Sequence, residues 1–244
     1  MSDVPKVSQV LVGVDFDDAS ASALNVAGAL AAAWDADVTL FHATRQDVPA
    51  YFTPAQIEAL EAARDQSRAG VISQVRAFAA PHVPRVVQVL VAEGPPQDAM
   101  LRMAASFDLI VVGTRQHRGP RRWWLGSVAE TVVLHSPRPV LVVPAGAVAP
   151  DTRRAPTILA AGGGGAEVWV ELLRTAFGGH VERSIDIQQW ALDRVHNADL
   201  IVLPVPADDR RRTQFGAIAL ALEECIRPVL FVPSIDGMLE RSLS

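Results

Sequence analysis

The sequence has almost no cysteine and no long apolar run. Cys225 is the single cysteine among 244 residues, which excludes an internal disulfide framework and a cysteine-based metal cluster. No run reaches the roughly 18 apolar residues of a membrane-spanning helix, so the sequence predicts no span. Residues 1–9 also lack the charged-then-apolar pattern of a secretion signal. We therefore expect a cytoplasmic protein without membrane contact.

An excess of positive charge is absent as well. The formal net charge is −5, which gives no general reason to expect nucleic acid or an anionic membrane as a partner. Arginines nevertheless gather in two short stretches, Arg115–Arg122 and Arg210–Arg212. No set of His, Cys or carboxylate residues has the spacing of metal ligands, so no protein metal site is predicted.

What the sequence does contain is an alternation of strand and helix patterns. Short runs rich in Val, Leu and Ile alternate with segments of helical period, which is typical of a mostly parallel sheet covered on both faces. In the first part of the chain these runs predict strands at Val10–Val14, Val38–His42, Val86–Val91, Leu109–Val112 and Val140–Val143. Helices are predicted after the acidic turn at Asp17, from Pro54, from Pro96 and over Ser127–His135.

The pattern then restarts after a predicted linker at Ala145–Ala155. A strand is predicted at Thr157–Ala161, a helix over Val168–Ala176, a strand at His180–Ile187 and a helix over Gln188–Asn197. Two later segments repeat earlier ones in register. Ala198–Leu203 repeats Phe107–Val112, and Arg227–Pro233 repeats Arg138–Pro144. We therefore expect two domains, a complete one at 1–146 and a truncated, degenerate copy at 155–236 that lacks one helix–strand unit.

Four segments in order resemble the universal stress protein family in its tandem-domain form. They are Val14-Asp15 with Ser20, Leu40–Ala43, Glu93–Pro96 leading to Phe107–Gly113, and Gly113–Arg115 followed by Leu125–Glu130. The resemblance implies two α/β domains of the flavodoxin-like (adenine nucleotide alpha hydrolase-like) type with parallel sheets. It implies strand order 3-2-1-4-5 in the first domain.

ATP-binding members of this family carry Gly, two residues, Gly, nine residues, then Gly-Ser or Gly-Thr. Glycines let backbone N–H groups approach phosphate oxygens, and the loop leads into the N-terminus of a helix. Gly113, Gly126 and Ser127 match this pattern, whereas Gln116 stands where the second glycine is expected. A side chain there could crowd a triphosphate.

The resemblance implies a nucleotide site with a defined set of residues. The acid that matches Asp15 helps to hold the adenosine moiety, and the backbone at Ala43 contacts adenine. Asp15 could instead be a helix cap, and Ser127 could be an N-cap as well as a phosphate contact. The predicted nucleotide-binding residues are Val14, Asp15, Ala43, Gly113, Gln116, Gly126, Ser127 and Val128.

The second copy is not expected to bind nucleotide. Gly162–Gly165 stands where the first copy has Asp15, and it lacks both the dinucleotide fingerprint and a Walker lysine. Pro204 replaces Gly113, and Gly216-Ala217 replaces Gly126-Ser127. Loss of the acid and of the hydroxyl is the reason that we expect no nucleotide binding by this copy.

The leading interpretation is a stress-response regulatory protein that binds ATP or AMP, with Mg²⁺ if ATP, and signals through conformation or an unknown protein partner. No catalytic residue is predicted, and slow ATP hydrolysis is the most that we expect. The alternative is a nucleotide-free scaffold in which Gln116 closes the pocket. An oxidoreductase or electron-transfer domain is disfavoured because the dinucleotide fingerprint is absent.

Assembly can be predicted from the last strand of each copy. Val140–Val143 and Val229–Val232 would each end a sheet and leave backbone groups unpaired. We expect these strands to pair within the chain as a pseudo-dimer, and a further homodimer remains open.

Overall fold

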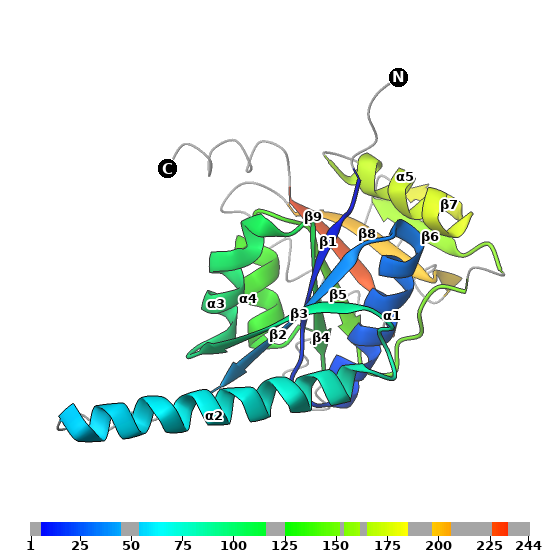
Figure 1. Ribbon diagram of the computed structural model, residues 1–244. Coiled ribbons are helices and arrows are strands. Elements are labelled where there is room, and N and C mark those ends of the chain that lie inside the picture. The colour runs from blue at the N-terminus through cyan, green and yellow to red at the C-terminus, as the bar shows by residue number, and fades with distance from the viewer. Residues whose placement is uncertain are drawn as a thin grey trace.

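The computed structural model describes residues 6–44, 54–115, 125–151, 154–161, 165–184, 197–205 and 226–233. Its strands form a nine-stranded sheet with the order β3-β2-β1-β4-β5-β9-β8-β6-β7 and helices on both faces (Figure 1). The first five strands are β1 (Gln9–Gly13), β2 (Asp37–Thr44), β3 (Val86–Glu93), β4 (Leu109–Thr114) and β5 (Val140–Pro144). The others are β6 (Thr157–Ala161), β7 (His180–Ser184), β8 (Leu200–Val205) and β9 (Val229–Pro233). The predicted α/β class and the order 3-2-1-4-5 are confirmed.

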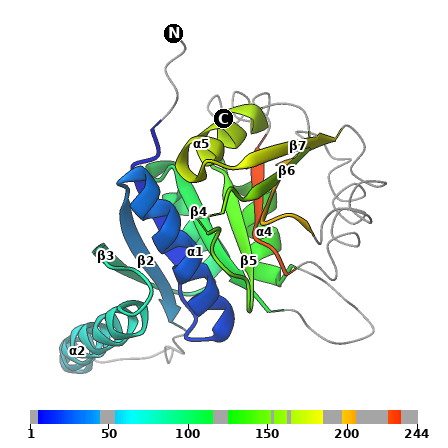
Figure 2. The same ribbon diagram turned by 90° about the vertical axis from the view of Figure 1, so that its right-hand side faces the viewer.

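Helices cover the two faces of the sheet separately. They are α1 (Asp18–Trp34), α2 (Pro54–Ala79), α3 (Pro96–Met103), α4 (Ser127–His135) and α5 (Ala166–Phe177), with a short 3₁₀ turn at Ala104–Ser106. Buried residues of α1, α2 and α5 pack in one hydrophobic cluster, and those of α3 and α4 pack in another. In Figure 2, α1 crosses in front of the sheet and α4 lies behind it.

The central strands of the sheet are buried on both sides, as their continuous apolar runs predict. In β1, Val10 and Val12 belong to the cluster with α1, whereas Leu11 belongs to the cluster with α3 and α4. All five residues of β5 and all five of β9 are buried. Alternate side chains therefore supply both cores, and no polar face is left on these strands.

The two parts of the chain meet at β5 and β9. These strands pair antiparallel, with Leu141 opposite Leu230, whereas every other strand pair described is parallel. The pairing of the two strands predicted to end their sheets is therefore observed. A second contact joins α1 to α5, where the Trp34 and Trp169 rings meet edge to face with centroids 6.3 Å apart.

The second part repeats the strand order of the first with fewer strands. Reading outward from the junction, β9, β8, β6 and β7 follow the order of strands 5, 4, 1 and 2. Among the described residues no strand lies beyond β7. The helix predicted over Gln188–Asn197 falls almost wholly outside the described residues. The domain division at 1–146 and 155–236 stays a prediction.

Asp108 in the first part and Asp199 in the second make the same kind of hydrogen bond to the backbone of a neighbouring strand. The Asp108 carboxylate accepts hydrogen bonds from the backbone N–H groups of Ser8, at 2.8 Å, and Gln9, at 3.0 Å. Asp199 accepts one from the backbone N–H of Thr157 at 2.8 Å. Both carboxylates precede the strand that pairs with β1 or β6, and they tie the starts of the two strands together. This contact explains why an aspartate occurs in both repeated segments.

The Asp108 contact predicts an acid-sensitive share of the stability. Burial by itself raises the pKa of the Asp108 carboxyl, but hydrogen bonds from Ser8 and Gln9 outweigh burial and lower the pKa below its ordinary value. A lowered pKa in the folded state adds stability above the unfolded value of ~3.8, and this stability is lost as the pH falls through the folded value. Asp108→Asn should lower the free energy of unfolding by about 1 kcal/mol at neutral pH.

Urea unfolding between about pH 3 and pH 7 checks this dependence. The difference between wild type and Asp108→Asn should be constant near neutral pH and shrink below pH ~4. Asp65→Asn, at an exposed position of α2, is the matched control and should change little. A difference that stays the same at acid pH would contradict the role given to the Asp108 charge.

Candidate functional site

A cavity of about 330 Å³ opens at the carboxyl edge of β1, β2 and β4. This is the edge at which open parallel sheets bind ligands. Seven of the eight residues predicted for the nucleotide site line it, and the eighth, Gln116, lies outside the described residues. The lining consists of Gly13, Val14, Asp15, Asp17, Ser20, Phe41, His42, Ala43, Pro96, Met100, Val112, Gly113, Thr114, Arg115, Gly126, Ser127, Val128 and Ala129.

The turn between β1 and α1 forms the polar end of the cavity. The Asp15 backbone N–H donates to the Ser20 hydroxyl at 2.8 Å. His42 Nδ1 lies 2.8 Å from the Val14 carbonyl oxygen, and a carbonyl only accepts, so Nδ1 carries the proton in this contact. Phe16 between the two acids has a positive φ of 52°, a conformation unusual for an aromatic residue. These contacts hold the turn with Asp15 and Asp17 both at the cavity.

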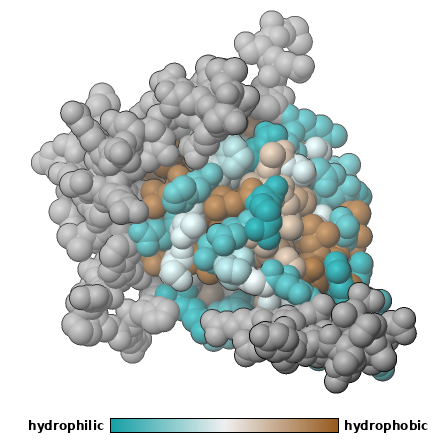
Figure 3. Space-filling view, turned by 90° about the vertical axis from the view of Figure 1, so that its left-hand side faces the viewer, coloured by the Kyte–Doolittle hydropathy of each residue, from teal (hydrophilic) through white to brown (hydrophobic). Residues whose placement is uncertain are grey.

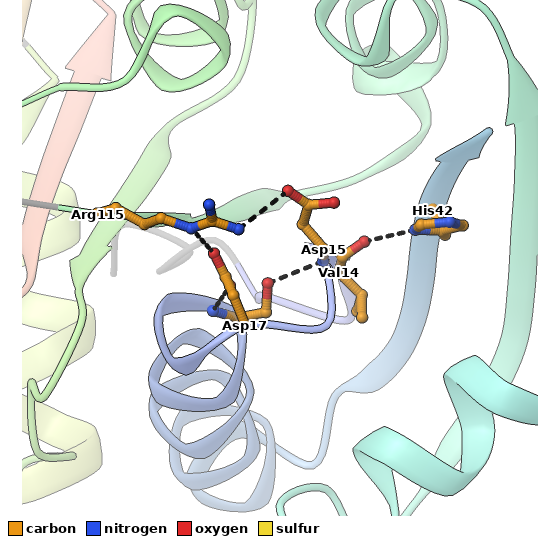
Figure 4. A network of polar contacts seen from close by, with 6 residues as sticks. Val14, Asp15, Asp17, His42 and Arg115 are labelled. Atoms are coloured by element: carbon orange, nitrogen blue, oxygen red, sulfur yellow. Dashed lines mark hydrogen bonds and ion pairs between the residues drawn. The ribbon is translucent and has the colours of Figure 1, made fainter. Parts of the chain in front are cut away.

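Asp17 begins α1 and also binds Arg115. Its carboxylate accepts the backbone N–H of Ser20 at 2.7 Å, which makes Asp17 the N-cap. Arg115 donates from Nε to the other carboxylate oxygen of Asp17, and its guanidinium lies 3.6 Å from the Asp15 carboxylate (Figure 4). Burial by itself raises the pKa of Asp17, but the hydrogen bonds from Ser20 and the guanidinium of Arg115 lower it below its ordinary value. Asp17 is therefore a fixed anion at the mouth of the cavity.

Two capping alternatives from the sequence are wrong. Asp15 does not cap α1, because Asp17 accepts the hydrogen bond from Ser20 while the side chain of Asp15 is 82% exposed. Ser127 does not cap α4, because the N-cap position is held by Gly126 and Ser127 is already helical. At Gly126 the backbone is still extended, with φ −66° and ψ 158°, so the helix begins at Ser127, one residue earlier than a serine cap at 127 would require.

The two matched glycines serve different needs. A Cβ on Gly113 would lie 2.6 Å from the backbone carbon of Ala19, so the protein itself requires glycine where β4 passes the start of α1. A Cβ on Gly126 would meet nothing within 4 Å, and its φ of −66° suits any residue. The Gly126 N–H donates to the Thr114 hydroxyl at 3.3 Å, which ties the start of α4 to the end of β4. Neither packing nor conformation therefore explains the glycine at 126.

Apolar side chains form the other end of the cavity. Phe41 and Met100 are buried, and Ala43 and Val128 are partly buried beside them. Seen from the side of α3 and α4, apolar residues emerge between polar ones rather than as one continuous apolar face (Figure 3). A cavity with one apolar end and one charged end suits a ligand that has a ring system and a polar group.

Some lining residues were not predicted to bind a ligand. Asp17, Ser20 and Arg115 are not among the residues that the sequence predicts for the nucleotide site, although the arginine-rich stretch Arg115–Arg122 is of a kind that favours anions. For Asp17 a sequence signal was available: it lies two positions after Asp15, and both acids follow the same strand, so both could be expected at the same edge of the sheet. Pro96 and Met100 come from α3, and no sequence signal marks them as cavity residues.

The described residues do not form a metal centre or a membrane span. Among them, no three or more His, Cys, Asp or Glu residues lie close enough together to hold a metal ion. No helix in the described part of the chain is both long and apolar enough to cross a bilayer.

Comparison with known proteins identifies the family. The model of the universal stress protein family matches residues 6–144, which is more than half of the chain, so the chain belongs to this family. No curated protein sequence matches it.

Two solved structures resemble nearly the whole chain. A universal stress protein from Archaeoglobus fulgidus is 15% identical with a TM-score of 0.64, covering 93% of this chain and 96% of that one. A functionally unknown protein from Pseudomonas aeruginosa PAO1 is 14% identical with a TM-score of 0.57, covering 96% of this chain and 95% of that one. At these identities the likeness shows the fold alone.

A further structure matches a shorter stretch. It is a universal stress protein in complex with cAMP, 28% identical over 58% of this chain and 100% of that one, with a TM-score of 0.41.

Proposed function

We propose that the cavity binds an adenine nucleotide, ATP or AMP, and that the protein is a stress-response regulator that signals through conformation or through a protein partner. The observation that carries the proposal is the convergence of seven predicted residues, from four separate segments, on one cavity. Glycine at 126 supports it further, because a Cβ there would meet none of the described residues within 4 Å and none of them requires a glycine at this position.

The residues present suit the parts of such a ligand. The apolar end beside Ala43 and Met100 suits an adenine ring, and the exposed Asp15 carboxylate suits the hydrogen-bond donors of the adenosine moiety. The first turn of α4, at Ser127 and Val128, presents backbone N–H groups and a partial positive charge to an anion. If ATP is the ligand, Mg²⁺ would enter with its phosphates.

We propose a regulatory rather than an enzymatic role. The proposal follows the family and the cavity, and no described residue of the cavity lining is assigned a catalytic part. Slow ATP hydrolysis is the most that this arrangement supports. The truncated second copy at 155–236 would then complete the sheet through β9 without a nucleotide site of its own.

Isothermal titration calorimetry with AMP and with Mg-ATP tests the proposal. Wild type should bind, and Gly126→Ala should bind at least about tenfold more weakly, a loss of ~1.4 kcal/mol, because the new methyl group occupies ligand space. Gly70→Ala is the matched control, since a Cβ there also meets nothing within 4 Å but lies on α2, outside the cavity lining. Equal binding by Gly126→Ala and wild type would contradict this site.

One more variant distinguishes the proposed function from the alternative, a nucleotide-free scaffold whose pocket is closed by Gln116. Nucleotide binding by Gln116→Gly alone, with none by wild type, would favour the scaffold. Binding by wild type favours the regulator.

A further inference from the structure

Arg115 stands at the mouth of the cavity, directly after β4. Of the cavity-lining residues that the structure describes, it is the only arginine or lysine. Its side chain is 58% exposed and reaches across the opening to the two acids of the β1–α1 turn (Figure 4). The guanidinium therefore lies where the charged part of a ligand would enter.

The two acids hold this guanidinium unequally. The side chain of Asp17 is only 18% exposed, and its carboxylate is fixed by the helix-capping bond from Ser20. The side chain of Asp15 is 82% exposed, and its carboxylate lies 3.6 Å from the Arg115 guanidinium, beyond hydrogen-bond distance. An ion pair as exposed as that with Asp15 is weak because water screens both charges. Asp15 is therefore the partner that another anion can replace.

Phosphate is the anion best suited to replace it. A guanidinium forms charge-assisted, often bidentate, hydrogen bonds with phosphate oxygens, and these are stronger than an exposed ion pair whose atoms lie 3.6 Å apart. The hydrogen bond from Arg115 Nε to the Asp17 carboxylate would hold the guanidinium at the mouth of the cavity throughout this exchange.

We propose that Arg115 is the charge selector of the site: it binds a phosphate group of the nucleotide, which takes the place of Asp15 at the guanidinium while Asp17 keeps its contact. The exchange releases the Asp15 carboxylate for the adenosine moiety. This inference rests on the proposed nucleotide function, and it assigns the discrimination between nucleotide and nucleoside to one side chain.

Titration with AMP and with adenosine tests the selector, because the two ligands differ only in the phosphate. Arg115→Gln should weaken AMP binding by about tenfold or more and leave adenosine binding within about twofold. Arg115→Lys, which keeps the charge without the planar fork, should recover part of the AMP affinity. Asp15→Asn, which removes the competing charge, should raise the ratio of AMP affinity to adenosine affinity.

Arg85→Gln is the matched control. Arg85 also pairs with two aspartates, Asp35 and Asp37, but lies outside the cavity lining, so both ligands should bind this variant as they bind wild type. Retained adenosine binding by Arg115→Gln shows that the variant is folded. An equal loss for both ligands, or no loss for AMP, would overturn the selector and leave the proposed function standing. Wild type that binds neither ligand would overturn the proposed function and the selector together.

Discussion

Gly113→Ala is expected to lower the free energy of unfolding by about 3 kcal/mol, since it inserts a methyl group into a contact between two backbones. The Cβ would lie 2.6 Å from the Ala19 carbon, 2.7 Å from its carbonyl oxygen and 3.0 Å from the Ser20 nitrogen. These are backbone atoms at the start of α1, so no flexible side chain can move aside. Either β4 or α1 must shift, and both are central to the fold. Chemical denaturation followed by circular dichroism measures the loss.

Gly126→Ala is the control within the same glycine pattern. With open space at its Cβ, its free energy of unfolding should stay within about 0.5 kcal/mol of wild type. The pair separates two roles of glycine within one sequence pattern: Gly113 should affect stability, whereas Gly126 should affect ligand binding. Wild-type stability in Gly113→Ala would contradict the close approach of β4 to α1.

Leu230→Asp is expected to cost more than about 3 kcal/mol, because it combines the loss of a buried leucine with the burial of a carboxylate. Leu230 is 2% exposed at the middle of β9 and lies opposite Leu141, which is 1% exposed, across the antiparallel junction. β9 also pairs with β8 on its other side, so the substitution affects the joint between the two parts of the sheet. Urea unfolding and size-exclusion chromatography measure the outcome.

Ile226→Asp provides the comparison for this substitution. Ile226 precedes the same strand but is 51% exposed, so a carboxylate there stays hydrated and should change stability little. If the two variants were equally stable, Leu230 would not lie at a buried junction. A monomer whose two parts unfold in separate transitions would show that the junction is not cooperative.

The pattern of apolar residues in the sequence was sufficient to predict the positions of most strands and helices. The apolar runs gave five strands of the first part within one or two residues at their starts, and Thr157–Ala161 agrees with β6 at both ends. Continuous Val, Leu and Ile runs are informative here because a strand covered on both faces has no polar side to confuse the pattern. Pro54 and Pro96 marked helix starts because proline suits a first helical position.

Capping residues show where the local signal was ambiguous. Asp15, Asp17 and Ser20 all lie near the start of α1, and each can accept or donate a capping bond. In the structure, Phe16 between the two acids has a φ of 52°, Asp17 caps the helix, and the side chain of Asp15 is exposed. A local pattern cannot fix that choice, because the turn is held by the ring of His42, 4.9 Å from the Phe16 ring.

The sequence by itself determined the elements and their order along the chain, because periodicity acts over short stretches, and the resemblance of its motifs to the universal stress protein family pointed to Gly113, Gly126 and Asp15 as candidate residues. Tertiary structure alone decided that Arg115 reaches Asp17, far away in the sequence, and that Met100 joins the same cavity. Those neighbours arise because β1 and β4 pair side by side in parallel, so that the segments after the two strands meet at the carboxyl edge of the sheet. Contacts between segments far apart in the chain leave no periodic trace in the sequence, and so they are known only from the fold.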